Sequence, residues 1–305
     1  MLDAKTSALI DKMLAGDRLA LARLITRVEN RAASVAEIMR RVHGRMGRAY
    51  ILGITGPPGS GKSTVVDRLT ALLRAEGASV GIVAVDPSSP FSGGAVLGDR
   101  IRMQSHTLDP EVFIRSMLAA AGYAWVLIET VGVGQTELDI MKLADTTVVV
   151  LVPESGDAIQ TMKAGLMEVA DVLVVNKADR AGANPLMTEL RFMAHLQRTS
   201  PQTPKDIDWE IPVLATQAQN DVGIVELLAA IRGHRGVLES TGALDKRRRA
   251  RRRAELQALL VEELTAEVSR RLGPDGDLAP TFEAVAAGRI DPYSAVRKIL
   301  KALAP

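Results

Sequence analysis

Short continuous runs of Val, Ile and Leu alternate along the middle of this sequence with longer stretches of helical periodicity. Six such runs have the length of β-strands, at residues 50–55, 79–85, 125–129, 146–152, 171–175 and 211–215. Runs that are apolar throughout are typical of parallel strands buried on both faces. The pattern therefore predicts an α/β fold with a doubly wound, mostly parallel sheet that ends near Gly233.

Helical patterns flank this core on both sides. Residues 6–39 carry apolar side chains at helical spacing, with a break where Gly16 ends one helix and Asp17 caps the next. Residues 236–242 have the composition of a linker, and 243–272 form a long helical pattern, followed by a break and a last helical segment. We predict an N-terminal helical extension (1–48), a nucleotide-binding domain (49–235) and a C-terminal helical arm (236–305).

Composition narrows the classes of function. The chain has 305 residues and no cysteine, which excludes thiol catalysis, zinc–cysteine sites and disulfides and fits a reducing compartment. A net charge of +2 and 3% aromatic residues argue against a nucleic-acid-binding protein. There is no run of ~20 apolar residues for a membrane span, and Asp3, Asp11 and Asp17 interrupt any signal peptide. We expect a soluble, cytoplasmic protein.

The strongest chemical signal is a phosphate-binding loop directly after the first predicted strand. It matches the pattern G-x-x-x-x-G-K-[ST], and a helix is predicted to follow it. Backbone N–H groups of such a loop surround phosphate oxygens, Lys62 would reach the β- and γ-phosphates, and Ser63 would ligate Mg²⁺. We expect the loop to bind through Gly56, Pro57, Pro58, Gly59, Ser60, Gly61, Lys62, Ser63 and Thr64.

A second motif indicates guanine as the base. Asn176-Lys177-Ala178-Asp179 follows a predicted strand. A carboxylate at Asp179 can accept hydrogen bonds from N1–H and the exocyclic amine of guanine, and adenine offers no such pair of donors. This favours GTP over ATP. Thr216, Gln217 and Ala218 follow the last core strand and occupy the place of a second guanine-contacting loop, although an ordinary strand-to-helix turn is equally compatible with them.

Two acidic residues follow predicted strands at the edge where a parallel sheet binds its ligand. Asp86 and Glu129 are therefore candidates for the Mg²⁺ site and for catalysis. Gln135, in a glycine-containing loop after Glu129, is a candidate for orienting the attacking water, with a surface glutamine as the alternative. The basic run at 246–249 and 251–253 begins a helix with an apolar stripe, so we interpret it as a solvated or interface surface.

Several segments together resemble a known family. Besides the phosphate-binding loop, they are 86–94 (Asp-Pro-Ser-Ser-Pro-Phe-Ser-Gly-Gly), 97–103 (Leu-Gly-Asp-Arg-Ile-Arg-Met), 129–135 (Glu-Thr-Val-Gly-Val-Gly-Gln), 153–157 (Pro-Glu-Ser-Gly-Asp) and 163–165 (Lys-Ala-Gly). The chain resembles the MeaB/ArgK family over nearly its whole length. Members of that family are GTPase chaperones of adenosylcobalamin-dependent methylmalonyl-CoA mutase.

The resemblance implies a P-loop GTPase whose GTP/GDP cycle gates cobalamin delivery to an acyl-CoA mutase, or protects or repairs it. It also implies a homodimer through the C-terminal helices and a switch in the loop that contains Lys163. By position, Asp99 would join Lys62, Ser63, Asp86 and Glu129 at the phosphate–Mg²⁺ site. A P-loop kinase acting on a small molecule is the alternative, although a guanine-reading motif is unexpected there.

The sequence departs from the family in two places. The second guanine loop usually contains a Ser-Ala pair where this chain has Thr216-Gln217-Ala218, which weakens the expectation of a base contact there. The stretch between the strand-like residues 111–115 and the strand at 125 is also short for a parallel crossover, which needs at least ~10–12 residues with its helix. We predict that residues are missing near Met117 and Leu118, either from the protein or from the given chain.

Overall fold

The structure is a computed structural model that describes residues 4–29, 34–42, 49–85, 112–114, 122–130, 144–153, 169–199, 207–273 and 276–303. The chain divides into two compact units, residues 1–246 and 247–305. The larger unit holds the N-terminal helices and the sheet, and the smaller one holds most of the C-terminal helices.

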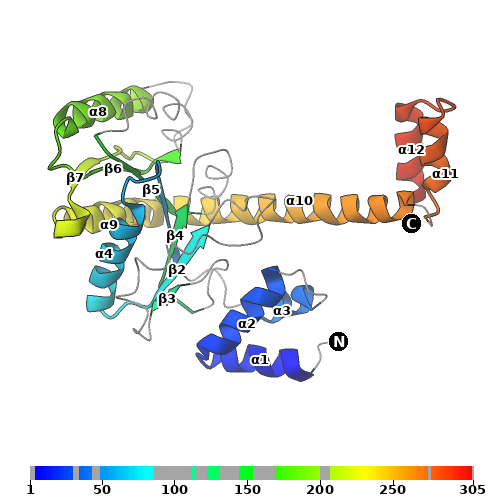
Figure 1. Cartoon of the computed structure of the whole chain (residues 1–305), viewed down its shortest axis with the longest axis horizontal. Helices are drawn as coiled ribbons and strands as arrows, with labels where there is room; N and C mark the ends of the chain where they lie inside the picture. Colours follow the sequence, from blue (N-terminus) through cyan, green and yellow to red (C-terminus); the bar gives the residue numbers. More distant parts are fainter. Residues whose placement is uncertain are drawn as a thin grey trace. The chain divides into compact units, whose positions relative to one another are not determined.

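A parallel sheet forms the centre of the larger unit (Figure 1). Its strands are β1 (Tyr50–Thr55), β2 (Val80–Val85), β3 (Val112–Ile114), β4 (Trp125–Thr130), β5 (Thr146–Leu151), β6 (Val172–Asn176) and β7 (Val213–Thr216). They lie in the order β3-β2-β4-β1-β5-β6-β7, and every paired neighbour runs parallel. The predicted fold class is confirmed.

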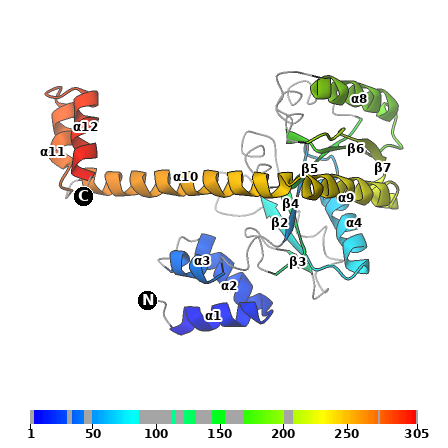
Figure 2. The same cartoon turned by 180° about the vertical axis from the view of Figure 1, so that it is seen from behind.

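Alternate residues of the strands enter two hydrophobic clusters, as expected for a sheet covered on both faces. Leu52, Val148 and Val174 pack in one cluster with α4 (Lys62–Ala75) and α9 (Ile224–Ser240). Val149 and Val175 enter the other cluster with α8 (Ala183–Thr199). Figure 2, seen from behind, shows α8 beside β6 and β7. The two clusters explain why these strands are apolar throughout.

The N-terminal extension contains three described helices, α1 (Ala4–Leu14), α2 (Arg18–Glu29) and α3 (Val35–Val42). The predicted break is present, and Asp17 caps α2 by accepting a hydrogen bond from the Ala20 amide at 3.0 Å. Ile10, Leu24 and Ile38 form a small core that joins the three helices. The predicted helical character of residues 17–39 is present in the described residues as α2 and α3, and Ile38 of α3 packs on the first two helices.

The predicted linker at 236–242 was also wrong. α9 continues to Ser240, and only the turn at Thr241 and Gly242 separates it from α10 (Ala243–Leu272). Glycines cost a helix roughly 1 kcal/mol each. For Gly233 and Gly236 of α9 that cost is offset by burial, since Leu238, which follows them in the helix, is fully buried.

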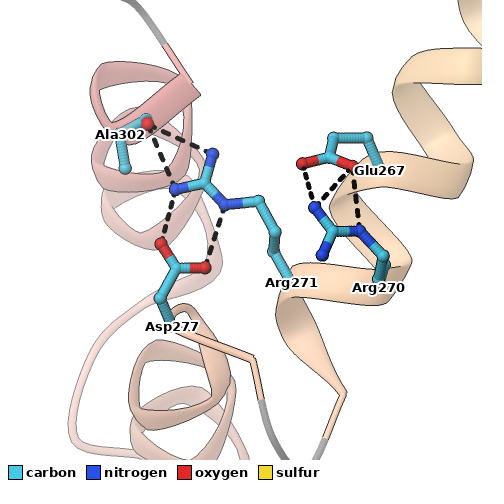
Figure 3. Close-up of polar contacts among 5 residues, drawn as sticks. All are labelled: Glu267, Arg270, Arg271, Asp277 and Ala302. Atoms are coloured by element: carbon cyan, nitrogen blue, oxygen red, sulfur yellow. Dashed lines mark hydrogen bonds and ion pairs between the residues drawn. The ribbon is translucent and has the colours of Figure 1, made fainter.

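In the C-terminal unit, Arg271 joins the ends of three helices (Figure 3). Its guanidinium donates to both carboxylate oxygens of Asp277, with Nε at 2.9 Å, and to the carbonyl of Ala302 at 3.2 Å. Asp277 precedes α11 (Ala279–Ala286), and Ala302 lies in the last turn of α12 (Pro292–Leu303). The guanidinium lowers the pKa of the Asp277 carboxyl below its ordinary value.

None of the described helices combines the length and the apolar character needed to cross a bilayer.

Candidate guanine-nucleotide site

The phosphate-binding loop joins β1 to α4 at the carboxyl edge of the sheet, and at two of its positions the backbone leaves room only for glycine. Gly56 has φ +141°, and a Cβ atom there would lie 2.0 Å from the carbonyl oxygen of Val150 on β5. Gly61 has φ +88° and immediately precedes α4, and a Cβ there would lie 2.4 Å from Nδ2 of Asn176. The first glycine therefore lets the loop approach the sheet, and the second lets it approach the guanine motif.

Lys62 is the first residue of α4, and its ammonium group turns back over the loop. Nζ donates hydrogen bonds to the carbonyls of Gly56 at 2.9 Å and Pro57 at 3.2 Å. The side chain is buried, so the loop carbonyls replace water around this cation. A phosphate in the loop would offer the same ammonium a charged acceptor.

Two of the four predicted metal ligands, Ser63 and Glu129, lie in the described part of the chain, and they lie together. The Ser63 hydroxyl donates to Oε1 of Glu129 at 2.6 Å. Glu129 is near the end of β4, and its carboxylate is buried. A hydroxyl and a carboxylate side by side form an all-oxygen donor set, which fits Mg²⁺ at a phosphate site.

Asn176 connects the phosphate-binding loop to the guanine-reading segments. From the end of β6, its Nδ2 donates to the carbonyl of Ser60 at 2.9 Å. Its Oδ1 accepts hydrogen bonds from the Thr216 hydroxyl at 3.0 Å and from the Ala218 amide at 3.1 Å. The side chain is buried, and all three partners belong to the two predicted nucleotide-binding loops. Asn176 therefore fixes the distance between the phosphate and base ends of the site.

Lys177 adds a second link. It is one of the two described non-glycine residues with positive φ, at 56°, and its Nζ donates to the carbonyl of Gly59 at 2.8 Å. The left-handed conformation turns the chain sharply after β6, so that Asp179 reaches the same cavity. No described group forms a hydrogen bond or ion pair with the Asp179 carboxylate in this structure, which leaves its oxygens open to a ligand.

The loop after β7 has a supporting role that the sequence reasoning missed. Thr216 is fully buried and pairs in register with Asn176 across β6 and β7. The Gln217 side chain accepts a hydrogen bond from Asn220 at 3.2 Å. The sequence shows a polar residue at the end of a buried strand, but that it lies beside Asn176 follows from the pairing of β6 with β7.

These residues surround one cavity of about 860 Å³, a size within the usual range for ligand sites. It contains predicted residues from the phosphate loop, the metal site and both guanine loops. Side chains that the sequence analysis did not single out also line it, namely Asp67, Arg68, Arg180, Gln219 and Asn220. Predicted site residues Asp86, Asp99 and Gln135 lie outside the described residues, as do Lys163, Met117 and Leu118.

Comparison with known proteins agrees with this geometry. The sequence matches the family described as "Methylmalonyl Co-A mutase-associated GTPase MeaB" over residues 21–119 and 116–272. The two matched stretches meet at the position where we predict missing residues.

Individual relatives cover nearly the whole chain. A protein of Pyrococcus abyssi named as a GTPase is 45% identical over 312 residues, covering 96% of this chain and 95% of its own length. The GTPase ArgK of Escherichia coli is 31% identical, covering 97% and 96%. A crystal structure titled LAO/AO transport system kinase has a TM-score of 0.69 and 27% identity, covering 100% of this chain and 99% of that one.

The family match extends from residue 21 through the phosphate-binding loop to the end of the long helix α10. Both the family and these two relatives are named for GTP hydrolysis. The chain therefore belongs to the MeaB family of methylmalonyl-CoA mutase-associated GTPases.

Proposed function

We propose that this GTPase acts as a metallochaperone for an adenosylcobalamin-dependent acyl-CoA mutase, with the methylmalonyl-CoA enzyme as the expected type. In this role GTP hydrolysis gates cobalamin delivery to the mutase, or protects or repairs it. The observation that carries the nucleotide half of the proposal is the position of Asn176, which holds both guanine loops to the phosphate-binding loop. The mutase half rests on the family match and its description.

At the phosphate end, Lys62 exchanges the carbonyls of Gly56 and Pro57 for the β- and γ-phosphate oxygens. Negative charge then develops against a fixed ammonium and the N–H groups at the start of α4, which stabilises the transition state. Ser63 and Glu129 would hold Mg²⁺, joined by Asp86 and Asp99 on the strength of the resemblance. When bound, the ion neutralises charge on the phosphates. Gln135 would orient the attacking water.

At the base end, the open carboxylate of Asp179 accepts N1–H and the exocyclic amine of guanine. With adenine the same carboxylate would find neither donor, and a carboxylate that the bound base covers without a hydrogen-bond partner costs about 1–3 kcal/mol. GTP is therefore the expected nucleotide. Gln217 and Ala218 contribute to the wall of the same cavity, while Thr216 supports Asn176 from behind.

The homodimer is proposed on the apolar stripe of α10. Leu256, Leu260, Val261 and Leu264 are all about half exposed or more, although they recur on one side of the helix. A contiguous apolar face of this kind is typical of a subunit interface. Its self-association would place two GTPase units in one assembly. The protein is expected to act in the cytoplasm.

The test measures GTP and ATP hydrolysis by the purified protein, with and without an adenosylcobalamin-dependent acyl-CoA mutase from the same organism. We expect turnover that is selective for GTP and rises when the mutase is added. A Lys62→Ala variant serves as the control, because any stimulation that survives in it comes from the mutase preparation. If the mutase left the rate of GTP hydrolysis unchanged, the proposed partner would be wrong. A preference for ATP with a small-molecule acceptor would indicate a kinase.

A further inference from the structure

A second concave surface lies on the N-terminal helices, away from the nucleotide cavity. It is a groove of about 700 Å³ between α1 and α2. Leu9, Leu19 and Ala22 are among its lining residues, and basic side chains from both helices complete it. None of these lining residues lines the nucleotide cavity, so the groove is separate from the nucleotide-binding residues.

The charge of the groove has one sign. Lys5 and Lys12 line it from α1, and Arg23 and Arg27 from α2, whereas no described acidic side chain lines it. The two acidic side chains that the structure describes in this hairpin have other partners. Asp11 pairs with Arg41 of α3 at 2.7 Å, and Asp17 caps α2.

Three of these cations are available for a ligand. Arg27 donates to the hydroxyl of Thr6, whereas the side chains of Lys5, Lys12 and Arg23 have no ion pair or hydrogen bond with any described residue. Unpaired cations on both sides of an apolar floor form a surface that is complementary to acidic groups flanking an apolar ridge.

The dimensions favour an elongated ligand over a single phosphate. Lys5 and Lys12 are seven residues apart on one helix, so they are about 10 Å apart along its axis. The cations therefore line the two sides of the groove and do not converge on one anion. An α-helix laid between two helices presents an apolar ridge with charged positions on both flanks, which matches this spacing.

An anionic membrane is the main competing ligand, and the shape of the surface argues against it. Helices that lie in a bilayer interface project several large apolar side chains outward. Among the described side chains of α1 and α2, Leu19 is the only large apolar group that is mostly exposed, and Ala22 is buried in the floor. The surface is hollow where a membrane-binding face would protrude.

We propose that the α1–α2 groove docks an acidic amphipathic helix of a partner protein. The apolar ridge of that helix would contact Leu9 and Leu19, and its Asp or Glu residues would pair with Lys5 and Lys12 on one side and Arg23 on the other. This inference does not depend on the nucleotide cavity or on the identity of the mutase.

The test uses a fluorescent peptide of about 18 residues with leucines at helical spacing and glutamates on both flanks. Binding is measured by fluorescence anisotropy against the full chain. We expect saturable binding that weakens as salt rises. A peptide with alanines in place of the leucines, and one with lysines in place of the glutamates, should each bind at least about tenfold more weakly.

Variants of the protein locate the site. Lys12→Glu and Arg23→Glu should each weaken peptide binding about tenfold. Arg191→Glu, at an exposed arginine of α8 with no partner among the described residues, should leave it unchanged. GTP hydrolysis reports whether each variant is folded, since none of these residues lies in the nucleotide cavity.

Three results would overturn the proposal. They are no binding at about 100 μM peptide, equal binding by the groove variants and Arg191→Glu, and preferential binding to vesicles of phosphatidylcholine with phosphatidylserine. The last result would assign the surface to a membrane.

Discussion

At the residue scale, Gly61 and Asn176 show how closely the phosphate and base ends of the site are packed. The Gly61 backbone lies where any side chain would press on the Asn176 amide. The amide in turn donates to the carbonyl of Ser60, one residue away. A change at either position therefore affects both ends of the nucleotide site.

Gly61→Ala tests this contact. The new Cβ would lie 2.4 Å from Nδ2 of Asn176, and the alanine would have to adopt φ +88°. We expect GDP affinity to fall at least about tenfold and the free energy of unfolding to fall by about 1–3 kcal/mol. The matched control is Gly77→Ala, because Gly77 has φ +81° with open space around its Cβ position. Isothermal titration of GDP should separate the two, and equal affinities would contradict the account.

Thr216→Val tests the support behind Asn176. The change keeps the shape of a fully buried side chain but removes the donor 3.0 Å from Asn176 Oδ1. We expect KM for GTP to rise about five- to twentyfold with little change in kcat, since a net hydrogen bond contributes about 1 kcal/mol. Thr70→Val is the control, because Thr70 is equally buried but bonds only within α4. A kcat effect without a KM effect would contradict this assignment.

At the element scale, the sequence was a good guide wherever a long apolar run forms a buried strand. All six predicted strands are present, since burial on both faces leaves few alternatives for such runs. Weak local signals were less reliable. Gly236 and Gly242 indicated a linker and Gly233 the end of the core, but α9 continues through Gly233 and Gly236 to Ser240. Packing holds this helix, and Trp209 lies 3.6 Å from the position of a Gly233 Cβ. That contact joins residues far apart in the chain, so no local pattern reveals it.

In the nucleotide site, too, strong sequence motifs were more informative than weak local signals. Residues in a fixed-spacing motif, such as Lys62 and Asp179, were singled out because the chemistry of phosphate and guanine requires them, and the structure places both at one cavity. The Lys177 contact to Gly59 and the support from Thr216 depend on strand order, which places β7 beside β6. Strand order follows from the whole fold, and the motifs do not encode it.

In the C-terminal unit, the Arg271–Asp277 pair predicts a measurable pKa. The Arg271 guanidinium lowers the pKa of Asp277. The pair therefore stabilises this unit at a pH above the ordinary aspartate pKa of about 3.8. That contribution is lost as the pH falls through the lowered value. Arg271→Ala should return the Asp277 pKa to its ordinary range, as followed by ¹³C NMR of the carboxyl group. Arg289→Ala, at an exposed arginine, is the control, and an unchanged Asp277 pKa in Arg271→Ala would refute the link.

At the scale of the whole molecule, the apolar stripe of α10 predicts self-association. Leu256→Glu with Leu260→Glu would place two charges in the proposed interface, and burying a charge costs far more than the contacts can return. We expect the dimer to dissociate, at least about hundredfold more readily, as measured by light scattering after size-exclusion chromatography. Ala266→Glu adds a charge to an exposed position away from the stripe and should stay dimeric. A monomeric wild type would disprove the interface.

The most direct test of the central claim exchanges the base that the cavity accepts. Xanthine carries a carbonyl where guanine has its exocyclic amine, so Asp179→Asn replaces an acceptor with a donor at the matching position. We predict that wild-type kcat/KM favours GTP over XTP by at least about a hundredfold, and that Asp179→Asn reverses this preference. If the variant kept the wild-type preference for GTP, Asp179 would not read the base and the guanine site described here would be wrong.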